Sequence, residues 1–160
     1  MSEVYIDDIY LGDAKSNSVE EIKLNSFTVK NGADETDQIT ASTSSLTADA
    51  EFTYSEKTSQ MPVAIYGAVY NQDGSLKKVY AVNDVIPQGA DGNETKTISL
   101  PMSFEGEDAL SAWDKIKVYL WKGDAPVPLA QSKAVNVTED KKYEYVACLL
   151  YTSWKNTLLI

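Results

Sequence analysis

The chain of 160 residues contains neither arginine nor histidine, so all of its side-chain cations are lysines. Without histidine there is no imidazole to serve as a general base, to activate a nucleophile, or to ligate zinc or haem. Without arginine there is no planar guanidinium to bind phosphate or guanine at two points. The formal net charge of −10 also opposes contact with a nucleic-acid backbone. We therefore expect neither histidine-based catalysis nor nucleic-acid binding.

Cysteine and long apolar runs are also scarce. Cys148 is the single cysteine, which excludes an internal disulfide framework. No apolar run reaches the length that spans a membrane, and no charged-then-apolar signal peptide leads the chain. We expect no membrane insertion, and a signal for export, if there is one, to lie outside this sequence.

Short segments of alternating apolar and polar residues dominate the remaining sequence and predict β-strands. The strongest hairpin signal is the segment 61–80. Both faces of its first strand are apolar, which is typical of a central strand covered on two sides. Asn71–Gly74 then predicts a tight turn in which Gly74 takes a positive φ. About seven such strands, separated by turns, predict an all-β fold, namely an immunoglobulin-like or fibronectin-III-like antiparallel β-sandwich.

Changes in composition divide the chain. Residues 21–140 carry the predicted sandwich, in which 31–45 is polar and predicted to be an exposed loop. Residues 12–20 form a polar linker. Residues 1–11 are strand-like, and 141–160 form a C-terminal tail. The alternative for 31–45 is an irregular edge of the sandwich. Inside the sandwich, Pro101 is expected to end its strand, and 105–113 to hold one helical turn.

The N-terminal run VYIDDIYLG resembles the closing strand of bacterial jelly-roll carbohydrate-binding modules. In several such families an aspartate of this strand ligates a structural calcium, and Asp7 or Asp8 is the matching residue. The rest of that module is absent, so we expect no metal site. The run is either the end of a preceding module or an N-terminal edge strand.

Two motifs of the main domain point to one family. In IYGAVYNQDGSLKKV, the residues Tyr70, Asp73-Gly74 and Leu76 match a recurring hairpin motif. In DKIKVYLWKGDAPVPLAQSKAV, 117–121 and 128–129 match a second one, with Lys122-Gly123 where an aspartate is usual. The region 22–137 thus resembles an immunoglobulin/fibronectin-type accessory module of large secreted glycan-acting proteins of clostridia-like bacteria. The resemblance implies an extracellular location, neighbouring modules as partners, and no catalytic residues.

The tail contains CLLYTS at 148–153, which resembles the translation of a transposon end sequence used as a sequencing adapter. On this interpretation 148–160 are an artefact and make few contacts with the sandwich. The alternative is a genuine C-terminal strand, because the segment is apolar.

The acidic residues lie mostly in predicted loops, where they solvate the surface and keep an ordinary pKa. A catalytic acid needs burial to raise its pKa. Asp91–Glu94 resembles half of a calcium loop, but no stretch has full EF-hand spacing. We therefore predict a non-enzymatic domain with no metal and no cofactor.

Aromatic side chains are the remaining candidates for function, because sugar rings stack on exposed tryptophan and tyrosine. The strand aromatics, of which Tyr66, Tyr70, Tyr119 and Trp121 are the main members, are expected to pack mostly in the core. Trp113 lies beside a turn and is expected to be partly exposed. The candidate carbohydrate-binding residues are Trp113, Trp121 and Tyr119.

We predict a spacer that positions neighbouring modules of an extracellular polysaccharide-handling protein. The alternatives are a carbohydrate-binding module in its own right and an adhesin or surface-repeat domain.

Overall fold

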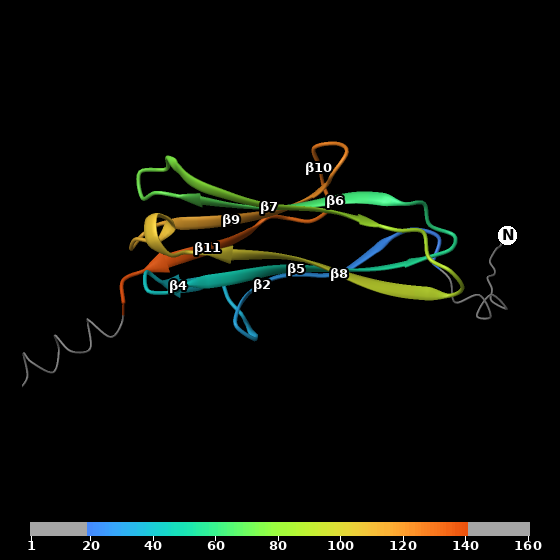
Figure 1. The fold of residues 1–160 in the computed structure, drawn as a ribbon, viewed down its shortest axis with the longest axis horizontal. Coiled ribbons are helices and arrows are strands. Elements are labelled where there is room, and N and C mark those ends of the chain that lie inside the picture. Colours follow the sequence, from blue (N-terminus) through green and yellow to red (C-terminus); the bar gives the residue numbers. More distant parts are fainter. Residues whose placement is uncertain (1–18, 141–160) are drawn as a thin grey trace, which may run out of the picture.

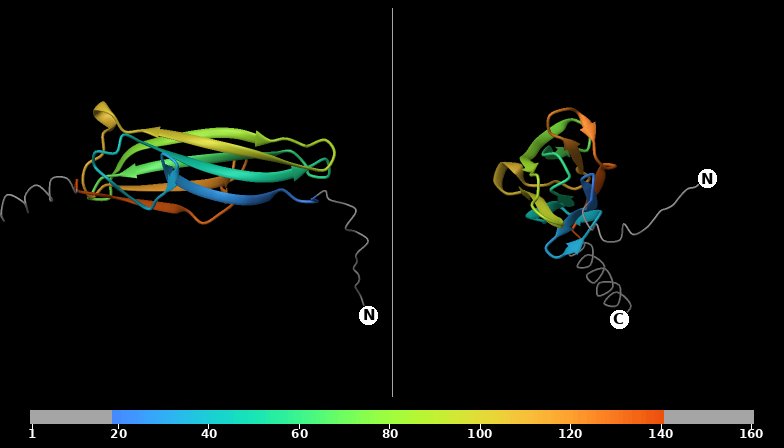
Figure 2. Two further views of the ribbon diagram at one scale, coloured as in Figure 1. Left: turned by 90° about the horizontal axis from the view of Figure 1, so that it is seen from below. Right: turned by 90° about the vertical axis from the view of Figure 1, so that its right-hand side faces the viewer.

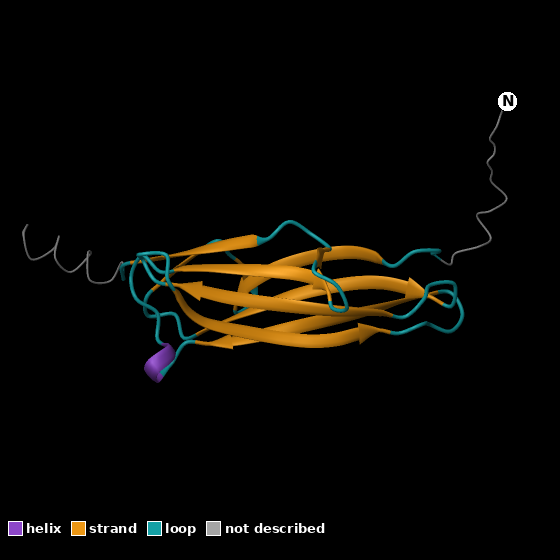
Figure 3. Cartoon of the chain, turned by 90° about the horizontal axis from the view of Figure 1, so that it is seen from above, coloured by secondary structure: helices purple, strands orange, loops and turns teal. Residues whose placement is uncertain are grey.

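Ten strands and one 3-10 turn make up the regular structure of residues 19–140, the part of the chain that the computed structural model describes. The strands are β2 (Lys23–Asn31), β3 (Asp34–Glu35), β4 (Gln38–Thr40), β5 (Ser45–Ser55), β6 (Met61–Tyr70), β7 (Leu76–Ile86), β8 (Asn93–Ser103), β9 (Lys115–Lys122), β10 (Val127–Pro128) and β11 (Lys133–Thr138). The 3-10 turn, Gly106–Asp108, confirms the helical turn predicted between β8 and β9. Figure 3 shows it as the one helical element in the described part of the chain.

The strands form two sheets that pack face to face (Figure 1). One sheet has the order β3-β2-β5-β8. The other has the order β4-β11-β9-β6-β7, with β10 paired to β9. The prediction of an all-β sandwich is therefore confirmed, with β6 in the interior of its sheet. The described chain enters at one end of an elongated body and leaves at the other, as Figure 2 shows.

The core lies between the sheets and is built from alternate residues of each strand. The predicted core residues all belong to one buried cluster: Phe52, Ile65, Val69, Ile98, Val118 and Leu120. On β6 the alternation includes Gly67, which faces the opposite sheet. A Cβ added to Gly67 would lie 2.5 Å from the Met102 sulfur, so a glycine lets the two sheets approach here.

The predicted hairpin is confirmed. β6 and β7 pair antiparallel from Met61 opposite Ile86 to Tyr70 opposite Leu76. Gly74 has a φ of 90°, and its N–H donates to the Asn71 carbonyl at 2.9 Å. The positive φ explains why this turn needs a glycine.

The polar stretch 31–45 is not a loop but corresponds to the alternative of an irregular edge, because β3 and β4 are edge strands of the two sheets. It contains β3 and β4, and Ile39 of β4 is buried in the core. β4 crosses to the second sheet and pairs in parallel with β11, with Val137 opposite Ile39. The sandwich is therefore not purely antiparallel, and the strand number exceeds seven because three strands are only two or three residues long.

Pro101 does not end its strand, contrary to the prediction. β8 continues to Ser103, with Pro101 opposite Thr47. β8 is the edge strand of its sheet, and an edge tolerates proline where no ladder hydrogen bond from its nitrogen is needed.

Several sequence predictions fall outside the described residues. They are the N-terminal strand-like run 1–11, most of the linker 12–20, and the tail 141–160 with its adapter-like segment. Within 19–140, no helix is long and apolar enough to cross a membrane.

Candidate functional site

The outer face of β6 and β9, which looks away from the opposite sheet, carries large aromatic side chains. Strand alternation places Tyr66 and Tyr70 of β6 and Tyr119 and Trp121 of β9 on this face, while the residues between them enter the core. All four are only partly buried. We call these four residues the aromatic face. The expectation that they pack in the core is therefore wrong, because no second layer covers this side of the sheet in the described structure.

The register between β6 and β9 places Tyr66 opposite Tyr119. At two other positions of the outer face, an alanine of β6 lies opposite a large side chain of β9. Trp121 lies opposite Ala64, and Lys117 lies opposite Ala68. The large side chains can therefore lean over the small ones, and the rings meet. Trp121 contacts Tyr66 with ring centroids 5.5 Å apart in an edge-on geometry, and Tyr119 at 5.9 Å.

A depression of about 400 Å³ lies among these rings. Ala68 forms part of it, because its short side chain leaves space between Tyr66, Tyr70 and Tyr119. Val79 of β7 also lines it and is 49% exposed. Tyr80 of β7, in contrast to the aromatic face, packs against the core. Its ring lies edge-on to Phe104, and its hydroxyl donates to the Ser103 carbonyl.

Hydroxyl groups add polar atoms to the aromatic face. Burial raises the pKa of Tyr119 above its usual value of 10.0, and a hydrogen bond with the Tyr70 side chain raises it further. The two hydroxyls therefore lie together at one side of the depression. A face of this kind can contact apolar C–H groups through its rings and hydroxyl groups through its phenols.

Trp113 lies beside the aromatic face and is 52% exposed, as expected from the sequence. It lines a second depression of about 450 Å³ together with Tyr70, Lys115 and Lys117, and Tyr70 also lines the first one. Trp113 has a φ of 74°, in the left-handed region that non-glycine residues rarely occupy. Its N–H donates to the Val137 carbonyl at 2.7 Å, which anchors this conformation.

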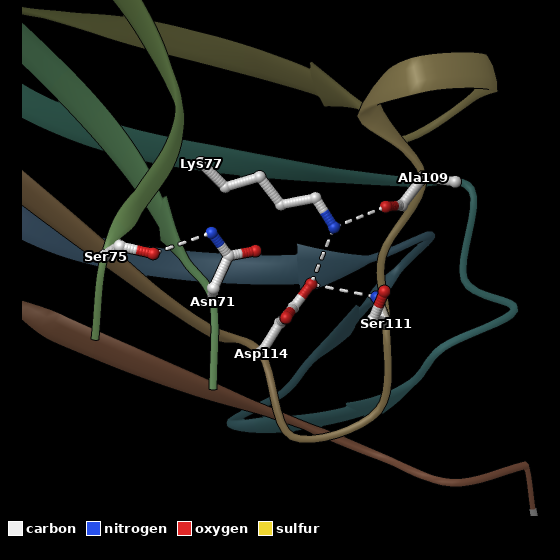
Figure 4. Close-up of polar contacts among 6 residues, drawn as sticks. All are labelled: Asn71, Ser75, Lys77, Ala109, Ser111 and Asp114. Carbon is white, nitrogen blue, oxygen red and sulfur yellow. Dashed lines mark hydrogen bonds and ion pairs between the residues drawn. The ribbon is translucent and has the colours of Figure 1, made fainter. Parts of the chain in front are cut away.

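A buried ion pair supports the loop that carries Trp113 (Figure 4). The Lys77 ammonium group donates to Asp114 Oδ2 at 3.0 Å and to the Ala109 carbonyl at 2.7 Å. The Ser111 N–H donates to the same Asp114 oxygen at 2.8 Å. The Asp114 side chain is 2% exposed and Lys77 is 18% exposed. The loop is thus tied to β7 by contacts that water screens poorly.

A third depression, of about 240 Å³, continues the surface beyond Tyr66 and Trp121 to the loop after β9. Gly123 of this loop donates its N–H to the Pro62 carbonyl at 2.9 Å. A Cβ at Gly123 would lie 3.3 Å from the Pro62 side chain and from the Val63 nitrogen. The close approach of the loop to β6 accounts for a glycine at this position.

Two acidic residues of the described structure have a lowered pKa. Hydrogen bonds from Ser75 lower the pKa of Asp73, and hydrogen bonds from Val85 and Lys96 lower the pKa of Asp84. Both stay ionised at neutral pH, whereas a glycosidase general acid needs a raised pKa. Glu94 of the half calcium loop accepts a hydrogen bond from the Ala90 N–H at 2.6 Å and so braces its own turn. In residues 19–140 no three acidic side chains lie close enough to hold a metal ion.

The structure thus gathers the three predicted residues on one continuous surface. Tyr119 and Trp121 are in ring contact, and Trp113 joins them through Tyr70. Sequence reasoning missed Tyr66 and Tyr70, which it assigned to the core, and the lysines 115 and 117. The even spacing of 115, 117, 119 and 121 is the signal that places these side chains on one face of β9.

Comparison with known proteins finds only partial similarity to solved structures. No protein-family model matches the chain, and no curated protein sequence matches it. Among solved structures it is similar to β-glucuronidase 2 of Bacteroides uniformis, both as a calcium-binding mutant and covalently bound to cyclophellitol-6-carboxylate aziridine. Each match has 12% identity and a TM-score of 0.41, and covers 69% of this chain and 13% of the β-glucuronidase chain. The chain thus spans only a small share of the length of those proteins, and the match carries no argument about this chain.

Proposed function

We propose that this β-sandwich is a non-catalytic glycan-binding module whose binding site is the aromatic face. The observation that carries the proposal is the partial exposure of Tyr66, Tyr70, Tyr119 and Trp121 around one depression on the outside of the sheet. A β-sandwich gains little stability from four large aromatic side chains on a face that residues 19–140 leave uncovered, unless something binds there.

A glycan fits this surface because it offers both kinds of group that the surface recognises. Its C–H faces are apolar and can stack on the rings, and its hydroxyls can pair with phenols, amides and ammonium groups. Polar groups lie at the rim of the rings: the Tyr70 and Tyr119 hydroxyls, the Asn71 and Gln72 amides, and Lys115. Eight residues of β9 extend the surface over about 26 Å, so that a chain of sugars rather than a single sugar fits along it.

The setting proposed from the sequence is a multimodular extracellular protein. The hairpin and β9 motifs support it, and both lie in the sheet that carries the aromatic face. The strand order, with β2-β5-β8 facing β11-β9-β6-β7, supports an immunoglobulin-like assignment within the sandwich class.

The spacer function is a second candidate, favoured by the positions of the chain ends. The described chain begins near Val19 at one end of the long axis and finishes near Asp140 at the other, so flanking modules would be held in line (Figures 1 and 2). A spacer does not require the aromatic face to bind anything. A glycan-binding experiment therefore distinguishes the spacer function from the glycan-binding function.

The test is affinity electrophoresis of the full chain in native gels that contain xylan, pectin, a soluble cellulose derivative or mannan. We expect at least one polysaccharide to retard the protein, and the Tyr119→Ala/Trp121→Ala double variant to migrate as it does in a gel without polysaccharide. Thr97→Ala, an exposed change on the opposite sheet, is the control and should be retarded like the unchanged protein. If the unchanged protein migrates freely in every gel, the glycan-binding proposal fails and the spacer function stands.

A further inference from the structure

We propose that the ligand of the aromatic face is an acidic glycan whose carboxylates contact Lys115 and Lys117. This inference rests on the proposed glycan binding and adds the chemical class of the ligand. It follows from the place of the two lysines, from the absence of an ion pair between them and any residue of 19–140, and from the charge of the rest of the protein.

Lys115 and Lys117 lie on the same outer face as the rings. They precede Tyr119 and Trp121 at even spacing along β9, and their neighbours across the sheet are Tyr70 and Ala68. Both line the second depression, between Tyr70 and Trp113. A sugar ring stacked on Tyr70 or Trp113 would therefore hold its substituents within reach of an ammonium group.

The lysines at this site are not neutralised within the described structure. Four other lysines pair with carboxylates, namely Lys30, Lys77, Lys78 and Lys96. Neither Lys115 nor Lys117 forms an ion pair with any residue of 19–140. The second depression is lined by aromatic, amide and lysine side chains and by Gly74, without a carboxylate.

Two acidic residues that adjoin the lining of the second depression in sequence are already engaged elsewhere. Asp114, next to Lys115, is buried and faces Lys77 and the Ser111 N–H. Asp73 of the β6–β7 turn accepts hydrogen bonds from the N–H and hydroxyl of Ser75, at 2.9 and 2.6 Å.

The overall charge makes this arrangement informative. In a chain with 24 acidic residues and 14 lysines, two neighbouring lysines that form no ion pair within 19–140 make the surface beside the exposed rings locally basic. The rest of the protein carries a net negative charge and repels polyanions. We therefore expect an acidic polymer to bind only at the surface around Lys115 and Lys117. Charge complementarity at the rings therefore favours a glycan that carries carboxylates over a neutral one.

The experiment compares two polymers with the same backbone and different charge, polygalacturonate and its fully methyl-esterified form, by isothermal titration of the full chain. We expect polygalacturonate to bind about five- to tenfold more tightly at low salt, as two exposed ion pairs would provide. The difference should shrink as salt is raised, because exposed charges are screened.

The Lys115→Gln/Lys117→Gln variant should lose this preference, so that it binds polygalacturonate no more tightly than the methyl ester. Lys23→Gln, on an exposed position of the opposite sheet, is the matched control and should keep the preference. Polyglutamate, which offers carboxylates without sugar rings, should not bind measurably.

The outcomes separate the two proposals. Equal binding of both polymers, with no effect of the lysine changes, would overturn the acidic-glycan inference and leave glycan binding intact. Binding of polyglutamate as tight as that of polygalacturonate would also overturn it. Absence of binding to any glycan, including those of the gel panel, would overturn both.

Discussion

The inner and outer faces of the β6–β9 strand pair are built from alternate residues of the same two segments, yet they differ in what surrounds them. On the inner face Ile65, Val118 and Leu120 have no exposed surface and meet the opposite sheet. On the outer face Tyr66 and Trp121 contact other side chains of their own sheet and remain partly exposed. The difference teaches that an apolar side chain on a strand stabilises the fold mainly when a second sheet packs against it and buries its surface. Where no layer faces it, another role is expected.

The largest effect expected from this comparison is on the inner face. Leu120→Ala should lower the free energy of unfolding by about 2–5 kcal/mol, because it opens a cavity in a filled core. Urea denaturation followed by circular dichroism measures this change. A loss near zero would mean that the inner face does not hold the fold.

A slightly smaller loss is expected from the ion pair that supports the Trp113 loop. Lys77→Met leaves the buried Asp114 carboxylate without its counter-charge and should cost about 2–4 kcal/mol in the same assay. Lys78→Met is the matched control, since the Lys78–Asp108 pair is 41% and 38% exposed, and its loss should stay within about 0.5 kcal/mol. Equal losses for the two variants would contradict the view that burial makes the first pair important.

The close approach of the sheets at Gly67 should be sensitive to a single methyl group. Gly67→Ala places a Cβ against the Met102 sulfur and should cost about 1–3 kcal/mol through overpacking. The cost should be partly relieved in the Gly67→Ala/Met102→Ala variant, whose total loss should be less than the sum of the single losses. If the stability losses of the two single variants add up to that of the double variant, the Cβ at position 67 and the Met102 side chain do not overpack.

How much of this could be predicted from the sequence is clearest at three places. The hairpin turn at Gly74 and the core role of Leu120 followed from local signals, since turn chemistry and alternation act over a few residues. Ile39 was missed because a single apolar residue in a polar stretch carries no periodicity, and its burial depends on a parallel pairing with β11 from far along the chain.

The site was only partly predictable, because both faces of β6 are apolar. Alternation places Tyr66 and Tyr70 on one face of β6 and Ile65 and Val69 on the other. It does not predict which of the two faces packs against the opposite sheet. The exposure of Trp113 followed from its place beside a turn, whereas its left-handed backbone depends on tertiary contacts such as the hydrogen bond to Val137.

The smallest expected effect concerns the hydroxyl pair of the outer face. Burial, the larger cause, and the Tyr70 hydroxyl both raise the pKa of Tyr119. A raised pKa means that the folded state favours the neutral phenol of Tyr119 more than the unfolded state does. The resulting contribution to the free energy of unfolding is complete below pH 10.0, the usual pKa, and is lost as the pH rises through the pKa of the folded state. Tyr70→Phe should lower the pKa of Tyr119 without restoring the usual value, because burial remains.

An NMR titration of proteins with labelled tyrosine rings measures this pKa, with the Tyr119 signal assigned by its loss in Tyr119→Phe. An unchanged Tyr119 pKa in Tyr70→Phe would show that the two hydroxyls do not interact.

The central claim is that the inner face holds the fold while the outer face holds a glycan, and Trp121→Ala tests it most directly because Leu120, its neighbour in sequence, points the other way. The measurement is the free energy of unfolding of Trp121→Ala, taken together with its migration in the polysaccharide gel that retards the unchanged protein. The account predicts a stability loss of about 0.5–1.5 kcal/mol, from the lost ring contacts, together with complete loss of retardation. A stability loss as large as that of Leu120→Ala, or retardation equal to that of the unchanged protein, would contradict it.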